Sequence, residues 1–181
     1  MRQRPPDNHA CDLAGNGLRN IAFYYAIRQV PELPRGEVWS TVGDNFMRLA
    51  ILDWCKIFAD RKGKLNWRRE APRPETFMND LLQAIDVSQS DFEIYTTQMR
   101  RVRNKWVAHL DPEIYGADPR NKTPYLGLAL QSLAYFYDRA RNGATTAVLS
   151  AEIVASALWE YEKRLAWAQT EFARITRVDM S

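Results

Sequence analysis

The chain has 181 residues, 46% of them hydrophobic, and a formal net charge of +3, which suits one domain with its own core and a mildly basic surface. Its two cysteines, Cys11 and Cys55, fit neither a disulfide framework nor a metal-ligand spacing, and no apolar stretch reaches the roughly 18 residues of a membrane span. We therefore expect a cytoplasmic protein with no metal, cofactor or membrane contact.

Few glycines and β-branched residues, against many Ala, Leu, Arg and Glu, predict an all-α, single-domain bundle of five to six helices. We expect residues 1–11 to form a mobile tail and residues 12–181 to form the domain. A first helix is predicted over about 13–30, interrupted early by Gly15 and Gly17. A second, over about 36–60, shows apolar residues three or four apart: Val38, Val42, Phe46, Leu49 and then Leu52 or Asp53.

Asp53 interrupts the apolar face of this second helix. One interpretation makes it a supporting residue that holds Arg103 or His109 in place. The other makes it a structural acid paired with Lys56, three residues along the same helix. The sequence leaves both open.

Residues 61–73 are strongly basic, with a single acid, and Gly63 and Pro72 predict a linker without regular structure. In one interpretation this linker binds RNA phosphates through Lys64, Arg68 and Arg69, with Trp67 free to stack on a base. In the other it is a solvated connection and Trp67 packs into the core.

Three further helices and a long last one follow. The first of them covers about 74–86, with Phe77, Leu81, Leu82 and Ile85 inward, and a capping box of Ser90 and Glu93 predicts the next helix from Asp91. The apolar stripe of that helix is Phe92, Tyr95, Met99, Val102, Trp106 and His109. A fifth helix is predicted from Pro124 to about Arg141, with one face formed by Leu126, Leu130, Leu133, Ala134 and Tyr137. A last helix, from Ser150 to about Arg177, carries a coiled-coil-like seam.

The most informative segment is Arg103-Asn104-Lys105-Trp106-Val107-Ala108-His109, near the end of the fourth predicted helix. Arginine holds a permanent charge suited to phosphate, and histidine exchanges a proton near neutral pH, so the pair could cleave a phosphodiester without metal. Six helical residues rotate by about 600°, which leaves the two side chains about 120° apart. Two copies related by a two-fold axis would bring both pairs into one cleft. The ordinary alternative is a surface arginine and a polar helix end.

The Arg-Asn pair followed five residues later by His, and then by Leu110-Asp111, resembles the HEPN superfamily, particularly its abortive-infection-type members. The resemblance implies a four-helix core, a two-fold homodimer and a metal-independent endoribonuclease of toxin–antitoxin or antiphage systems. It implies that Arg103 stabilises the phosphorane, His109 transfers the proton and Asn104 orients phosphate or histidine. Asp111 stands where some relatives carry a tyrosine associated with a nucleotidyltransferase partner, which argues against that partner.

The helix that carries the motif also offers residues for RNA contact. Arg100 and Lys105 flank Arg103 and Asn104, and Arg101 extends the basic ridge. Two other functions fit the same sequence. One is a nucleic-acid- or nucleotide-binding HEPN module without catalysis, and the other is a helical interaction protein such as an antitoxin or assembly subunit. Besides RNA and a second copy of the chain, the candidate partners are a cognate antitoxin or another neighbouring-gene product.

Overall fold

The computed structural model describes residues 9–29, 37–104, 125–142, 162–163 and 165–171. Every regular element in these ranges is a helix, which confirms the all-helical class. The α-helices are α1 (His9–Gln29), α2 (Glu37–Trp54), α3 (Trp67–Glu70), α4 (Pro74–Ala84), α5 (Gln89–Val102) and α7 (Leu126–Asn142), and a π-helix, η1 (Cys55–Ala59), continues α2. None of the helices in the described ranges has the length and apolar character needed to cross a membrane.

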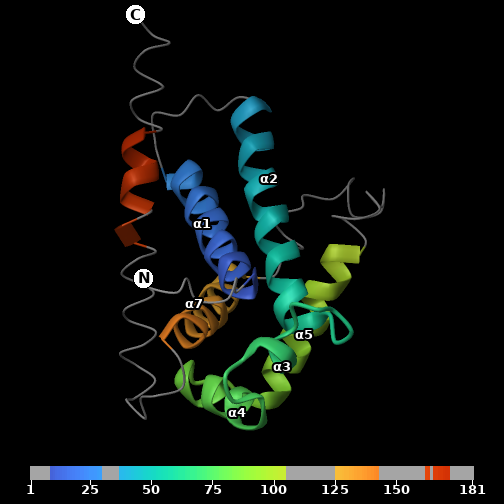
Figure 1. Ribbon diagram of the computed structural model, residues 1–181. Helices are drawn as coiled ribbons and strands as arrows, with labels where there is room; N and C mark the ends of the chain where they lie inside the picture. Colours follow the sequence, from blue (N-terminus) through green and yellow to red (C-terminus); the bar gives the residue numbers. More distant parts are fainter. Residues whose placement is uncertain (1–8, 30–36, 105–124, 143–161, 164, 172–181) are drawn as a thin grey trace, which may run out of the picture.

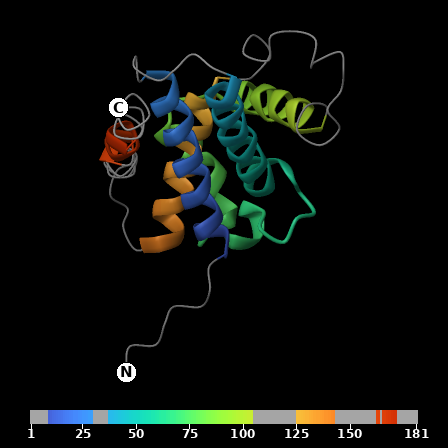
Figure 2. The same ribbon diagram turned by 90° about the horizontal axis from the view of Figure 1, so that it is seen from above.

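The helices pack around α1 and the end of α2 (Figure 1). α1 lies against both α2 and α7, and α5 packs against η1. Viewed from above, α1, α2 and α7 lie close together, while α5 extends away from them on one side (Figure 2). The short α3 packs on α4, and α4 in turn contacts α7.

Trp54, the last residue of α2, is at the centre of the core and is fully buried. Its indole stacks on Phe58 and meets Tyr95 edge-on, with centroid separations of 5.2 and 5.3 Å. Its Nε1 donates a buried hydrogen bond of 2.8 Å to the hydroxyl of Ser132. One side chain therefore joins α2, η1, α5 and α7, which is the packing that fixes the end of α2.

The first helix begins at His9, inside the segment that was expected to be a tail. Ala10 and Cys11 are buried in the described structure, and burial of apolar side chains extends the helix toward its N-terminus. The predicted interruption at the two glycines is also wrong, because α1 continues through both. A Cβ at Gly15 would lie 3.1 Å from the ring of Tyr137, so this glycine allows α1 and α7 to approach closely.

The apolar stripe that the sequence predicted for α2 does not form the core. Val38 is 70% exposed and Leu49 is 46% exposed. The buried face is the one formed by Met47, Ala50, Ile51 and Trp54. Both faces show helical spacing, so the packing of α1 and α7, and not the periodicity, decides which of them is buried.

The inward faces of the next two helices are confirmed. All four predicted core residues of the α4 region are buried, and so are Phe92, Tyr95, Met99 and Val102 of α5. The predicted start of α5 is wrong by two residues, because Ser88 and not Ser90 caps it. The Ser88 hydroxyl accepts from the backbone N–H of Asp91 at 3.1 Å. The backbone N–H bound by the capping serine is therefore that of Asp91 and not that of Glu93. Trp106 and His109 lie outside the described residues.

The last two predicted helices are confirmed where they are described. α7 begins at Leu126, two residues after Pro124, and buries Leu126, Leu133 and Ala134. Of the predicted last helix, residues 162–163 and 165–171 are described, and they are helical. Trp167 lies 6.0 Å from Phe23 and Gln169 donates a hydrogen bond to Gln29, so this segment contacts α1. The remainder of the predicted last helix lies outside the described residues.

Candidate functional site

Arg103 and Asn104 follow directly on α5, where the winding widens to π-helical geometry. The backbone N–H of Arg103 donates to the carbonyls of both Met99 and Arg100. Arg103 is half-buried and Asn104 is exposed, and the Nε of Arg103 donates a hydrogen bond of 2.9 Å to the side-chain carbonyl of Asn104. The two terminal nitrogens of the guanidinium donate no hydrogen bond to another described residue. They can therefore donate hydrogen bonds to a phosphate, while Asn104 holds the plane of the guanidinium.

The buried side of the site is formed by η1, which packs against α5. Cys55, the first residue of η1, is fully buried. Burial raises the pKa of its thiol to about 12, although the positive charges of Arg103 and Arg100 lower it in part. The thiol stays protonated at neutral pH, and Cys55 is therefore a core residue and not a nucleophile.

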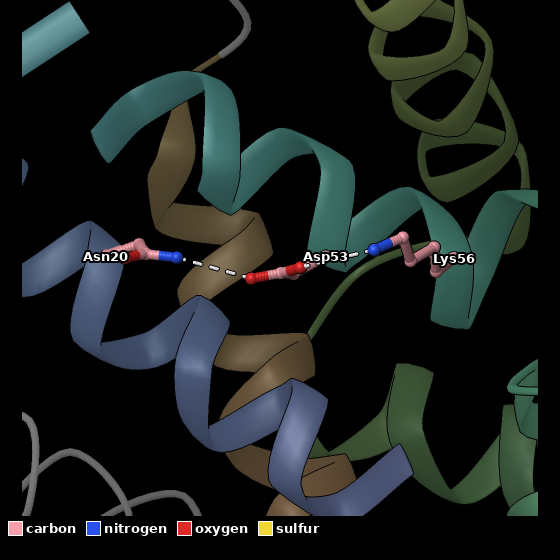
Figure 3. Close-up of polar contacts among 3 residues, drawn as sticks. All are labelled: Asn20, Asp53 and Lys56. Atoms are coloured by element: carbon pink, nitrogen blue, oxygen red, sulfur yellow. Dashed lines mark hydrogen bonds and ion pairs between the residues drawn. The ribbon is translucent and has the colours of Figure 1, made fainter. Parts of the chain in front are cut away.

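Asp53, two residues before Cys55, is buried, and Figure 3 shows its polar contacts. The side-chain amide of Asn20 donates to its Oδ2 at 3.2 Å, and the Nζ of Lys56 lies 3.8 Å from its Oδ1. Burial raises the pKa of the Asp53 carboxyl, and the opposing effects of the Lys56 charge and the Asn20 hydrogen bond are smaller. Asp53 thus joins α1 to α2.

These contacts bear on the two interpretations of Asp53. Its partners in the described residues are Asn20 and Lys56, so the pairing with Lys56 is confirmed. No hydrogen bond or ion pair joins Asp53 to Arg103 in the described part of the chain, and support of Arg103 stays a prediction. Contact with His109 cannot be described, since His109 lies outside those ranges.

The basic segment 61–73 is more ordered than the predicted linker, because α3 lies inside it. Asn66 is fully buried in front of α3. Its side-chain carbonyl accepts from the backbone N–H of Arg68 at 3.2 Å, and its side-chain nitrogen donates to the carbonyl of Ile57 at 2.9 Å. This asparagine caps α3 and ties it to η1.

Trp67 faces the core and not the solvent. Its side chain is 6% exposed, and its ring stacks on Phe77 with centroids 5.4 Å apart. The interpretation in which Trp67 stacks on a base is therefore wrong, and the packing of Trp67 into the core is confirmed. The guanidinium of Arg68 covers the ring, 4.4 Å from its centroid, in a cation–π contact.

The basic side chains of segment 61–73 remain uncompensated. Within the described ranges no ion pair involves any of them: Arg61, Lys62, Lys64, Arg68, Arg69 and Arg73. All six are exposed. Burial, and after it the charge of Arg61, lower the pKa of Arg68.

The structure describes Arg103, Asn104 and Arg100 on one helix end, and Lys64, Arg68 and Arg69 in the separate segment before α4. His109 and Lys105 lie outside the described residues. Sequence analysis missed Asn66 and Asn20. Asn66 carried a signal, because asparagine is a favoured N-cap residue and a helical turn follows it.

In comparisons with known proteins, the chain matches no family model, no curated protein and no solved structure.

Proposed function

We propose that this chain is a cytoplasmic HEPN-type endoribonuclease that cleaves RNA without metal, as a two-fold homodimer in a toxin–antitoxin or antiphage system. The observation that carries the proposal is the arrangement at the end of α5. Asn104 holds the guanidinium of Arg103 through its Nε, and the terminal nitrogens are left for a ligand. The sequence places His109 six residues further on.

In the proposed reaction the ribose 2′-hydroxyl attacks the adjacent phosphate, and the bond to the 5′-oxygen of the next nucleotide breaks. Arg103 donates to the non-bridging oxygens, where negative charge grows in the transition state. The 2′-hydroxyl loses its proton to solvent as it attacks, and His109 donates a proton to the leaving 5′-oxygen, so the protons balance. Asn104 positions Arg103, so that less rotational freedom is lost when phosphate binds. The products are a 2′,3′-cyclic phosphate and a 5′-hydroxyl.

The homodimer follows from the geometry of a helix. Arg103 and His109 would diverge by about 120° on one helix, so each active site needs a partner helix in the proposed arrangement. Two-fold dimers are also the commonest closed oligomers. Cleavage should therefore depend on dimerisation, and dilution below the dimer dissociation constant should reduce the activity per chain.

The test is cleavage of RNA by the purified chain in EDTA, with the end groups of the products analysed. Arg103→Ala and His109→Ala should each lower the rate by about 100-fold or more, by loss of charge stabilisation and of proton transfer. Arg28→Ala is the matched control, because Arg28 is an exposed arginine on α1 and not on the helix that carries the motif. Equal residual cleavage in all four proteins would point to a contaminating nuclease and overturn the proposal.

A second candidate is a nucleic-acid-binding module of the same class without catalysis. The uncompensated basic side chains of residues 61–73 favour it. RNA binding that weakens steeply with salt, by a dimeric protein that yields no cyclic-phosphate ends, would establish this candidate in place of the first.

A further inference from the structure

We propose that residues 61–69 form a preorganised phosphate-binding element that holds the RNA backbone without contacting the bases. The inference rests on the proposed function for the identity of the ligand, RNA, but not for its cleavage. Three features of the segment carry it: its side chains, its anchoring and its position.

Every exposed side chain in the element is basic. The exposed residues between 61 and 69 are Arg61, Lys62, Lys64, Arg68 and Arg69, and the other four are buried or half-buried. Sequence-tolerant binding of single strands usually combines such charges with exposed aromatic rings on which bases stack. Trp67 is the aromatic residue of this element, and it is buried against Phe77 and covered by Arg68. The element therefore presents charge for phosphates and no ring for bases.

The element is anchored at several points, unlike a freely solvated charged loop. The backbone N–H of Gly63 donates to the carbonyl of Asp60 at 2.9 Å, and that of Asn66 donates to the carbonyl of Gly63 at 3.3 Å. The buried side chain of Asn66 then holds the segment to Ile57 of η1. A fixed backbone limits the conformational entropy lost on binding to that of the long side chains.

The element concentrates positive charge. Burial, and after it the charge of Arg61, lower the pKa of Arg68, and no carboxylate forms an ion pair with either residue in the described part of the chain. Like charges in a compact state repel one another and destabilise it. A bound polyanion would remove this repulsion, so binding should also stabilise the folded protein.

The position of the element connects it to Arg103. η1 packs against α5 and also accepts the hydrogen bond from Asn66. In both views the chain between η1 and α3 lies on the same side of the molecule as the C-terminal end of α5 (Figures 1 and 2). An RNA strand bound at Arg103 can continue onto this element.

The experiment measures binding of RNA oligonucleotides by fluorescence anisotropy at several KCl concentrations, with His109→Ala in every protein to prevent cleavage. The test variant combines Lys62→Ser, Lys64→Ser and Arg69→Ser. We expect the slope of log K against log[salt] to become less steep by about 2, since each lost phosphate contact to a single strand changes it by about 0.7. Oligo(U) and oligo(A) should lose affinity by the same factor, because no base is read.

The control variant removes three exposed arginines elsewhere: Arg19→Ser, Arg28→Ser and Arg141→Ser, on α1 and α7. It has the same net charge as the test variant, and its slope should equal that of the parent. Equal slopes in test and control, a loss confined to one base, or no RNA binding by the parent would overturn the inference. Lys64→Ser alone should change the slope by about 0.7 and serves if the triple variant does not fold.

The outcome is distinguishable from that of the proposed function. Suppose that the slope is reduced in the test variant but the chain that retains His109 does not cleave RNA without metal. This result would contradict the proposed enzyme activity and support the phosphate-binding element. Cleavage with an unchanged slope would support the enzyme and contradict the element.

Discussion

Asn66 donates a hydrogen bond of 2.9 Å to the backbone carbonyl of Ile57, and the asparagine side chain is fully buried. The π-helix η1 ends at Ala59, so its last carbonyls have no partner within the helix. Asn66 supplies a donor to one of them and, through its own carbonyl, accepts from the N–H of Arg68. One amide group therefore satisfies the end of one helix and the beginning of the next.

We expect Asn66→Ala to lower the free energy of unfolding by about 1–3 kcal/mol, because it leaves the buried carbonyl of Ile57 and the partly buried N–H of Arg68 without their partner. Asn79→Ala on α4 is the control, since Asn79 is exposed, and it should change the value by at most about 0.5 kcal/mol. Urea unfolding followed by circular dichroism measures both. Equal effects of the two substitutions would show that the Asn66 contacts contribute little.

The sequence predicted the buried face correctly in the helices that have a single apolar face. Phe77 and Leu81 of α4, and Phe92 and Met99 of α5, leave no alternative face of comparable hydrophobicity, and all four are buried. In α2 two faces compete, and the wrong one was chosen, because the contacts that decide between them come from α1 and α7. Local pattern fixes the existence of a helix better than its orientation.

The same distinction holds at the candidate site. The Arg103–Asn104 contact joins neighbours in the chain, and the Asp53–Lys56 ion pair joins residues one helical turn apart, so both could be anticipated. The hydrogen bond from Asn20 to Asp53 spans 33 positions and depends on how α1 packs on α2. The burial of Trp67 depends on Phe77 in the same way. Contacts between separate elements were beyond the reach of the sequence pattern.

The cap of α5 offers a test in which the chain contains its own control. Ser88 accepts from the N–H of Asp91, whereas Ser90 lies inside the first turn of the helix. Among the described residues, the hydroxyl of Ser90 forms a hydrogen bond with that of Ser88 and with no backbone N–H. We expect Ser88→Ala to lower the free energy of unfolding by about 1 kcal/mol, through loss of the cap. Ser90→Ala should lower it by less than about 0.5 kcal/mol, as is usual for an exposed position. Thermal or urea unfolding of the two variants decides which serine is the cap, and a larger loss for Ser90→Ala would contradict the assignment.

The buried carboxyl of Asp53 should make stability depend on pH. Its pKa is raised from 3.8 in the folded state, so the folded protein binds more protons than the unfolded chain as pH rises from 3.8 to the native pKa. The contribution of Asp53 to the free energy of unfolding therefore falls as pH rises through this interval. Above the native pKa the carboxyl is ionised in both states, and the loss of stability has reached its full value. Asp53→Asn removes the titration.

We expect the free energy of unfolding of Asp53→Asn, relative to that of the wild type, to rise as the pH is raised from about 3 to about 7, because only the wild type loses stability through this titration. Urea unfolding at each pH measures the difference. Asp86→Asn makes the same chemical change at an exposed carboxylate. Its backbone φ is 52°, which asparagine tolerates, so it is a suitable control. The same trend in both variants, or the opposite trend in Asp53→Asn, would contradict the prediction.

Gly17 is a second position where α1 lies close to α7. A Cβ on Gly17 would lie 2.9 Å from Cδ1 of Leu133 and 3.5 Å from Cβ of Asp53. Leu133 is fully buried, so its side chain has little space into which it can move. We expect Gly17→Ala to lower the free energy of unfolding by about 1–3 kcal/mol through overpacking.

Gly43→Ala in α2 is the matched control for this substitution. Its Cβ would be 3.5 Å from Cγ2 of Ile27, an ordinary contact, so the better helix propensity of alanine should raise the free energy of unfolding by up to about 1 kcal/mol. A double-mutant cycle of Gly17→Ala with Leu133→Ala completes the test by urea unfolding. Removal of the Leu133 methyl groups makes room for the new Cβ, so the pair should be less destabilised than the sum of the single changes. Additive losses would show that Leu133 is not the group that excludes a side chain at Gly17.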